Sequence, residues 1–297
     1  MCETWEGHCS ITPLPGFTFV GKPRGGRGGG VGFYISRTLA PLVKAHTATQ
    51  LPEGMWLEVS GRGAAARPIF LGLAYLPPSS LASAAGARAT YELLRTDIES
   101  FQERGQVLVM GDLNSRVGSA QPGQLPAARI GRWGEPGPAD AAGRELLALL
   151  GATDLYALNG REAAASGLPA FTRLRTVQRA GGALEEEKAV LDYMLAPGEW
   201  ALPSGVAPAP CALRVDEHWR ITGADHLLLW TSVPHPAARA QVATRSRRVA
   251  NTGLLKLPGP QGAAHVEAYQ EAIADAVANY NNVVNNLRAH VRLGQVS

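Results

Sequence analysis

The chain has 297 residues, of which 45% are apolar, enough for one large domain with an appendage or for two modest domains. Its formal net charge of +3 is too small to indicate a polyanion partner by itself. Its three cysteines, Cys2, Cys9 and Cys211, form no repeating pair, which argues against a spaced zinc site and indicates free thiols in a reducing compartment. No apolar run approaches the roughly 20 residues of a membrane span, and the N-terminus lacks the basic start and hydrophobic stretch of a signal peptide, so we expect a soluble, intracellular protein.

Hydrophobic patterning predicts strands and helices in irregular alternation up to about residue 235. Residues 1–30 look loop-like and end in a glycine-rich run. The predicted elements that follow are strands at 31–36, 55–60, 68–75 and 106–110, helices over 90–104 and from near 140 to 150, and strands at 189–195 and 227–232. Several strands in succession favour a layered α/β or α+β fold in which sheets pack inside flanking helices.

The composition changes after Pro236. A basic patch that contains Arg245, Arg247 and Arg248 precedes the linker signal Gly259-Pro260-Gln261-Gly262. An apolar stripe at heptad-like spacing follows, formed by Val266, Tyr269, Ile273, Tyr280, Val284 and Leu287. We therefore predict a basic linker over 236–262 and an amphipathic helical tail over 263–297, which packs on its own domain or begins a missing one rather than forming a coiled coil.

The strongest local signal for chemistry is the segment Val107-Leu108-Val109-Met110-Gly111-Asp112-Leu113-Asn114. A buried strand delivers a carboxylate and an amide to its carboxyl end, where layered α/β folds commonly build their sites. An aspartate there can orient a water beside a metal, and an asparagine can hydrogen-bond a phosphate oxygen without adding negative charge. The alternative is an ordinary turn after a strand, since these are common turn residues.

Two further segments place carboxylates beside apolar strands. Asp192 interrupts the apolar run Val190–Leu195, and a buried carboxylate requires a cation or a protonated ring as a partner. His226, in Gly-Ala-Asp-His before a second apolar strand, is a candidate partner, because an aspartate fixes a histidine's tautomer and raises its basicity. The alternatives are a salt bridge of Asp192 with an arginine, and an Asp225-His226 pair that merely decorates the surface.

Two more residues are weak signals alone. Tyr75, in Ala-Tyr-Leu-Pro-Pro, puts a phenol at a strand end, where it can also be a simple edge tyrosine. Glu3, in Cys-Glu-Thr-Trp, carries no information by itself.

The combination and order of these motifs resemble the endonuclease/exonuclease/phosphatase superfamily, the family of DNase I. The segments that match are Glu-Thr-Trp, a glycine-rich stretch into Val-Gly-Phe-Tyr-Ile, Tyr-Leu-Pro-Pro, Gly-Asp-Leu-Asn, Leu-Asp-Tyr-Met-Leu and Gly-Ala-Asp-His. The set is most similar to the endonuclease domain of non-LTR retrotransposon polyproteins, a branch also indicated by Arg27–Gly32, by Gly143–Leu147 and by Leu155–Asn159. The resemblance covers about residues 1–235 and implies a DNase I-like β-sandwich of two mixed sheets flanked by helices.

The resemblance also implies roles for individual residues. Asp112 and Asn114 match the pair that positions the nucleophilic water and the substrate, and Asp192 and His226 match the Asp–His pair. Tyr75 matches a tyrosine that contacts the phosphate. The metal ligands implied are Glu3, Asp225 and Asp112, and their hard oxygen atoms suit Mg²⁺ or Mn²⁺.

The match departs from the family in its first part. The family has a strand with a site asparagine, a helix and a second strand before the glutamate, so we expect a truncated fold without these strands. Ala224 stands where the family usually has serine, and Asp140 where retrotransposon members tend to have asparagine.

The function implied is a metal-dependent DNA endonuclease that hydrolyses phosphodiester bonds, in the nucleus if its substrate is chromosomal DNA. Two alternatives stay open: a truncated, inactive remnant that only binds nucleic acid, and a phosphatase of the same superfamily. The tail is compatible with a link into a reverse transcriptase domain, lost or downstream, and the oligomeric state is not determined by the sequence.

Five arginines are candidates for a phosphate track or are ordinary surface residues: Arg24, Arg27, Arg173, Arg175 and Arg179.

Overall fold

The computed structural model describes residues 13–24, 29–61, 67–120, 128–161, 171–179, 184–204, 209–216, 225–234 and the backbone of 247–250. These residues all belong to one compact unit of the chain, made of residues 1–219 and 225–254. Cys2, Cys9 and the predicted tail helix lie outside the described residues. Among the described helices, none combines the length and the apolarity needed to cross a membrane.

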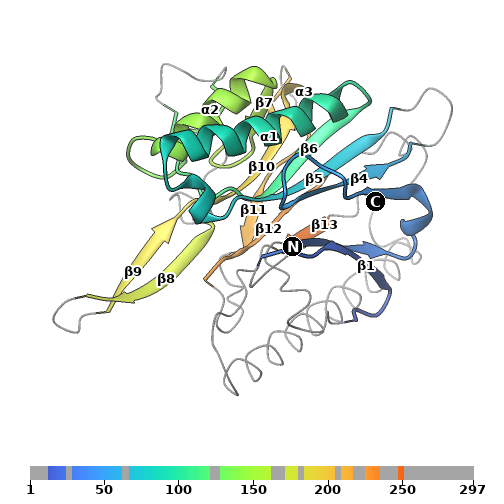
Figure 1. Cartoon of the computed structure of the whole chain (residues 1–297), viewed down its shortest axis with the longest axis horizontal. Helices are drawn as coiled ribbons and strands as arrows, with labels where there is room; N and C mark the ends of the chain where they lie inside the picture. Colours follow the sequence, from blue (N-terminus) through green and yellow to red (C-terminus); the bar gives the residue numbers. More distant parts are fainter. Residues whose placement is uncertain are drawn as a thin grey trace, which may run out of the picture. The chain divides into compact units, whose positions relative to one another are not determined.

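A six-stranded mixed sheet forms the centre of the described structure (Figure 1). Its strand order is β3-β4-β5-β6-β10-β7, in which β5 and β6 are parallel and the other neighbours antiparallel. The strands span Val43–His46 (β3), Gly54–Val59 (β4), Ile69–Tyr75 (β5), Gln106–Asp112 (β6), Asp192–Pro197 (β10) and Leu155–Ala157 (β7). Every residue of β5 is buried, because both faces of the sheet are covered.

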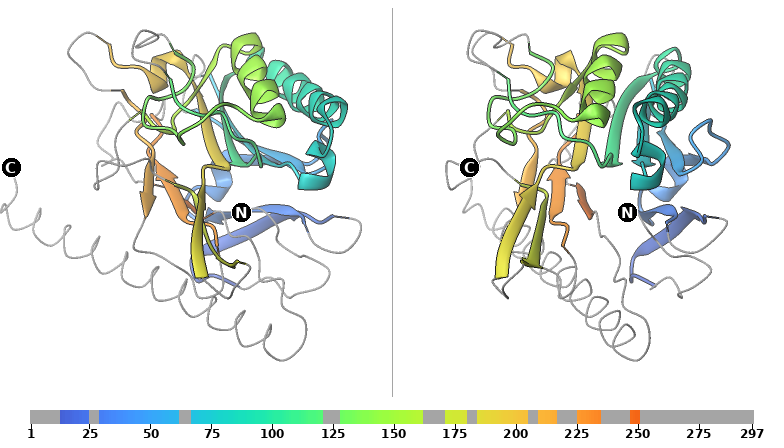
Figure 2. Two further views of the ribbon diagram at one scale, coloured as in Figure 1. Left: turned by 90° about the vertical axis from the view of Figure 1, so that its left-hand side faces the viewer. Right: turned by 60° about the vertical axis from the view of Figure 1, so that its left-hand side comes forward.

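Helices α1 (Ala84–Gln102) and α2 (Ala141–Ala152) cover one face of this sheet (Figures 1 and 2). Their buried faces, which include Tyr91, Leu94, Leu146 and Leu150, form one core with sheet residues such as Phe70. The side chain of Ser83 caps α1 by accepting from the Gly86 amide, and that of Asp140 caps α2 by accepting from the Gly143 amide. Short helical turns complete the helical elements: η1 (Ala40–Leu42), η2 (Pro78–Leu81) and α3 (Gly198–Ala201).

Two small antiparallel sheets pack on the opposite face. Strands β1 (Phe17–Lys22) and β2 (Val31–Ser36) form one of them, and β11 (Arg214–Asp216), β12 (Leu228–Thr231) and β13 (Arg247–Ala250) form the other. Phe33 of β2 and Leu229 of β12 share a core with Met55 and Leu71 of the central sheet. The layered sheet-on-sheet arrangement with flanking helices confirms the expected fold class, although the second layer consists of two antiparallel sheets in the described part.

A two-stranded hairpin, β8 (Arg173–Gln178) with β9 (Leu184–Ala189), extends away from the central sheet (Figure 2). Its residues are mostly exposed or half-buried. The charged, non-alternating sequence of β9, Leu-Glu-Glu-Glu-Lys-Ala, explains why no hydrophobic pattern predicts it, since its partner strand rather than a core stabilises it.

The predicted loop over residues 1–30 is wrong for Phe17–Lys22, which form β1. The β-favouring run Phe-Thr-Phe-Val lies between Gly16 and Gly21, and those glycines obscure it. Pairing with β2 over six residues stabilises it.

Helix α1 also begins six residues earlier than its apolar periodicity predicts, because an alanine-rich first turn and the Ser83 cap extend it. Residues 247–250, which the sequence placed in the linker, form strand β13 and pair with β12. The other predicted domain boundaries stay predictions.

Gly111 marks the point where β6 turns toward its polar end. Its φ is +146°, and a Cβ there would lie 1.8 Å from the carbonyl oxygen of Ala74 in the neighbouring strand. Only glycine therefore fits this position next to Asp112. Gly151, in the exposed last turn of α2, has ample room for a Cβ.

These two glycines give opposite predictions for alanine. We expect Gly111→Ala to lower the free energy of unfolding by at least about 3 kcal/mol, because strand β5 has to move. We expect Gly151→Ala to raise it by about 0.5–1 kcal/mol, because alanine is the better helix former. Urea denaturation of both variants checks this, and equal stabilities would contradict the assigned backbone geometry.

Candidate active site

Asp112 ends β6 between two other predicted site residues. Its register partner in parallel β5 is Tyr75, and its partner in antiparallel β10 is Asp192. All three are buried, with Asp112 6%, Tyr75 5% and Asp192 1% exposed. The pairing of β5, β6 and β10 thus gathers residues that lie far apart in the sequence at one edge of the sheet.

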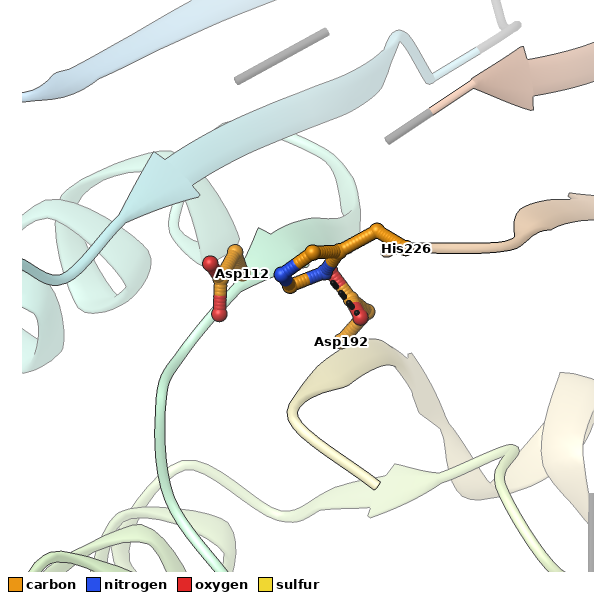
Figure 3. Close-up of side chains that lie close together, drawn as sticks. All are labelled: Asp112, Asp192 and His226. Carbon is orange, nitrogen blue, oxygen red and sulfur yellow. Dashed lines mark hydrogen bonds and ion pairs between the residues drawn. The ribbon is translucent and has the colours of Figure 1, made fainter. Parts of the chain in front are cut away.

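His226 lies between the two carboxylates (Figure 3). Its Nδ1 is 2.9 and 3.0 Å from the two carboxylate oxygens of Asp192. Its other ring nitrogen faces the side of Asp112 (Figure 3). The hydrogen bond that the sequence suggested between Asp192 and His226 is present, and no arginine takes its place among the contacts of the described residues.

The carboxylates determine the charge of His226. Burial alone would lower its pKa, but the negative charge of Asp192 and the hydrogen bond to it, with Asp112 and Asp225 nearby, raise the pKa to about 9. The ring is therefore protonated at neutral pH and can donate a proton to an anionic oxygen. A protonated imidazole cannot ligate a metal.

Asn114 lies in a tight turn directly after Asp112. Its φ is +44°, a region that asparagine tolerates better than most residues. The Asn114 amide N–H donates to the Asp112 carboxylate (3.0 Å), and its side-chain Nδ2 donates to the carbonyl of Leu76 (3.1 Å). The backbone at Asn114 therefore does turn, as the alternative reading of this segment proposed. The hydrogen bonds of that turn also fix the directions of the Asp112 and Asn114 side chains.

Asp225, a predicted metal ligand, is engaged by an arginine. The Nε of Arg173 donates to one carboxylate oxygen of Asp225 at 2.8 Å, and the other oxygen lies 3.9 Å from Nε2 of His226. Burial would raise the pKa of Asp225, but the hydrogen bond from Arg173 and the nearby positive charges lower it below its usual value. Its role as a metal ligand stays a prediction.

The other arginines proposed for a phosphate track also have acidic neighbours. Arg24 pairs with the buried Glu53 at 3.1 Å, Arg179 pairs with Glu185 at 2.6 Å, and Arg175 stands opposite Glu187 in the β8–β9 register. They therefore supply less net positive charge than their number suggests. Arg27 lies outside the described residues.

Glu3 also lies outside the described residues, so its role as a metal ligand stays a prediction from the resemblance. The described part of the site offers three candidate ligand groups. One ligand atom each from Asp112, Asp192 and His226 lie within 4.8 Å of one another. Of these, Asp112 offers the hard oxygen atoms that a divalent cation such as Mg²⁺ prefers, whereas both oxygens of Asp192 lie within hydrogen-bonding distance of His226.

A buried hydroxyl network supports the loop after Asp112, and no sequence motif indicated it. The Tyr91 hydroxyl is 2.8 Å from the Ser115 hydroxyl, which donates to the Leu113 carbonyl (2.7 Å). The Tyr193 hydroxyl donates to the Ser115 carbonyl (2.8 Å). Burial raises the pKa of both tyrosines well above the ordinary value, so both phenols stay neutral hydrogen-bonding groups.

Thr172 links the segments of the Asp192–His226 pair, and it too was not predicted. It is fully buried, and its hydroxyl oxygen accepts from the amides of Leu191 (3.0 Å) and Asp192 (3.1 Å). Its carbonyl accepts from the amide of Leu227 at 2.7 Å. The sequence offers only a threonine beside Phe171 as a signal. A single sequence cannot distinguish such a buried, bonding threonine from an ordinary turn residue.

The raised pKa of His226 predicts a pH-dependent contribution to stability. A folded-state pKa of about 9, against an ordinary 6.5, stabilises the fold fully below pH 6.5, and this stabilisation is lost as the pH rises through about 9. The free energy of unfolding of the wild type minus that of His226→Gln should therefore fall by on the order of 2–3 kcal/mol between pH 6 and pH 9.5.

Urea denaturation of both proteins across this pH range provides the measurement. Groups such as Cys211 titrate in both proteins and cancel in the difference. A difference that is constant, or that grows with pH, would show that His226 is not held protonated by its neighbours.

The sequence was also compared with known protein families and with curated protein sequences. The sequence matches the model of the endonuclease/exonuclease/phosphatase family over residues 2–226. No curated protein sequence matches the chain.

Similar solved structures include the endonuclease domain of TRAS1, a telomere-specific non-LTR retrotransposon, with 18% identity over 72% of this chain and 78% of that one and a TM-score of 0.43. The 3'-5' exonuclease NExo from Neisseria meningitidis has 16% identity over 71% and 77%, with a TM-score of 0.45. The D. rerio TDP2 complexed with single-strand DNA product has 12% identity over 73% and 78%, with a TM-score of 0.40.

The family model covers most of the chain, including each motif from Glu3 to His226. The chain therefore belongs to the endonuclease/exonuclease/phosphatase family of hydrolases that act on phosphate esters.

Proposed function

We propose that this protein is a metal-dependent phosphodiesterase that acts on DNA as an endonuclease of the retrotransposon type. The observation that supports this best is the Asp192–His226 hydrogen bond beside Asp112, with all three side chains at the polar edge of one sheet. This arrangement combines a carboxylate that can orient water with a cationic donor held in a fixed direction.

Each residue has a distinct role in phosphodiester hydrolysis. The carboxylate of Asp112 accepts a hydrogen bond from the attacking water, directs its oxygen toward phosphorus and takes up its proton, and the leaving oxygen takes a proton from solvent. Protonated His226, oriented by Asp192, donates to a phosphate oxygen and stabilises the negative charge that grows as the new P–O bond forms and the old one breaks. Asn114 and Tyr75 are the candidates to donate hydrogen bonds to the other phosphate oxygens, the roles that the family resemblance implies for them.

The carboxylates are the proposed metal ligands. Asp112, with Glu3 and Asp225, would hold Mg²⁺ or Mn²⁺, which neutralises the charge of the phosphate group when bound. His226 is left out of this set because its Nδ1 hydrogen-bonds Asp192 and the ring is assigned the role of donor to the phosphate. Asp225 keeps one oxygen toward His226 while Arg173 holds the other.

DNA is the proposed substrate because the motifs resemble those of retrotransposon endonucleases as a set. Three of the five candidate arginines are paired with carboxylates, so we expect only part of their positive charge to act on the phosphate backbone. We therefore expect weak affinity without strong sequence preference, with a shallow dependence on salt concentration.

Plasmid nicking tests this proposal. Purified protein should convert supercoiled DNA to the open circular form in Mg²⁺ or Mn²⁺, and excess EDTA should abolish the conversion. Asp112→Ala and His226→Ala should each reduce the rate at least about 100-fold, because each removes a group that acts on the reacting atoms.

The matched control is Arg95→Ala, which removes a positive charge from the exposed face of α1 and should change the rate less than about twofold. Absence of nicking in either metal, with DNA binding retained, would support the alternative of an inactive nucleic-acid-binding remnant. Faster turnover of p-nitrophenyl phosphate than of DNA would support a phosphatase instead.

A further inference from the structure

Asn159 stands where strand β7 leaves the central sheet. β7 pairs with β10 through Leu195↔Ala157, and the next contact is the Leu158 amide donating to the Met194 carbonyl at 2.8 Å. After Leu158 the main chain of β7 turns away. The edge of β10 at Asp192 therefore no longer has a backbone strand as its partner on this side.

The side chain of Asn159 continues the pairing. Its Nδ2 donates to the Asp192 carbonyl (2.8 Å), and its Oδ1 accepts from the Met194 amide (3.1 Å). Residues two apart in a strand direct these groups to the same edge. One side-chain amide, a donor and an acceptor in one plane, thus replaces the peptide group that a continuing strand would supply.

The turn after Asn159 is required by the loop that packs there. Gly160 has a φ of +67°, and a Cβ on Gly131 would lie only 2.0 Å from the Gly160 carbonyl carbon. The Trp133 amide donates to the Gly160 carbonyl at 2.9 Å. The loop therefore packs directly against the turn, and beyond Leu158 the side chain of Asn159, rather than the main chain of β7, bonds to the edge of β10.

With Asn159 in place, the backbone of Asp192 is held from every neighbouring element. Thr172 accepts from its amide, Asn159 donates to its carbonyl, and β6 pairs with it at Asp112. Asn159 is 7% exposed, so water does not easily replace its two hydrogen bonds. The loss of this amide would leave the Asp192 carbonyl without the donor of Asn159, while Thr172 still accepts from the Asp192 amide.

We infer that Asn159 is a positioning residue that fixes Asp192, and through it His226, for the reaction. This role rests on the proposed phosphodiesterase function. It predicts that removing the amide changes the geometry of the Asp192–His226 hydrogen bond, although Asn159 itself touches neither His226 nor the substrate.

Asn159→Leu tests the inference, because leucine has the same number and branching of side-chain heavy atoms and no hydrogen-bonding groups. We expect kcat for DNA nicking to fall about 10- to 100-fold, the usual size for loss of an outer partner of a site, while KM changes less than about threefold. All rates are measured well below the lowest Tm.

The matched control is Asp97→Leu. Asp97 is equally buried, 6% exposed, and its carboxylate also accepts from two backbone amides, those of Gln50 and Leu51. A purely structural role of Asn159 predicts equal kcat values for the two variants after a similar loss of Tm. Positioning predicts that only Asn159→Leu loses kcat.

A proton NMR measurement separates this inference from the proposed function. The proton shared by His226 Nδ1 and Asp192 should resonate far downfield of the amide protons, and its assignment follows from its absence in His226→Gln. We expect the resonance to shift or vanish in Asn159→Leu and to persist in Asp97→Leu. If the wild type does not cleave DNA, the proposed function fails and this signal alone decides the role of Asn159.

An unchanged resonance together with a kcat within about threefold of the wild type would overturn the inference. If Asn159→Leu does not fold, Asn159→Asp replaces it, because it keeps the acceptor for Met194, loses the donor to Asp192 and sets a negatively charged oxygen against the Asp192 carbonyl. The same losses are expected there, in kcat and in the downfield signal, and their absence would equally overturn the inference.

Discussion

The site depends on a pair of like charges held in register. Asp112 and Asp192 are directly opposite each other on β6 and β10, and both are buried. Carboxylates facing each other across a ladder repel, and burial strengthens the repulsion. His226 resolves this by accepting a proton and hydrogen-bonding Asp192. The cation between the two acids offsets their repulsion, and it places a protonated donor beside the carboxylate of Asp112.

Neutral groups rather than further charges keep this arrangement rigid. Thr172 connects the segments of Asp192 and His226, Asn159 completes the edge of β10, and hydroxyls from Tyr91 and Tyr193 hold the loop after Asp112. Each satisfies backbone or hydroxyl groups that would be costly to bury unpaired. Because none of them ionises near neutral pH, they fix directions without altering the balance of charge around His226.

Charge around the site is compensated locally. Arg173 pairs with Asp225 beside His226, and Arg24 and Arg179 also pair with carboxylates. The net charge of +3 is therefore a poor guide to how a polyanion approaches. Three of the candidate phosphate-track arginines are thus paired with carboxylates, and the cation beside Asp112 is His226, which is itself hydrogen-bonded to Asp192.

The sequence by itself determined the layered fold class, most strands of the central sheet, and Asp112, Asn114, Asp192 and His226 as candidates. These follow from local facts: apolar runs fix buried strands, and polar residues at their ends stand out. Only the tertiary structure decided which residues meet. The partner of Asp225 is Arg173, and the supports of Asp192 are Thr172 and Asn159, because strand register and the turn at Gly160 bring together segments that share no local pattern. The strands β1 and β9 also depend on such pairing, because flanking glycines obscure the pattern of β1 and the charged sequence of β9 has no apolar alternation.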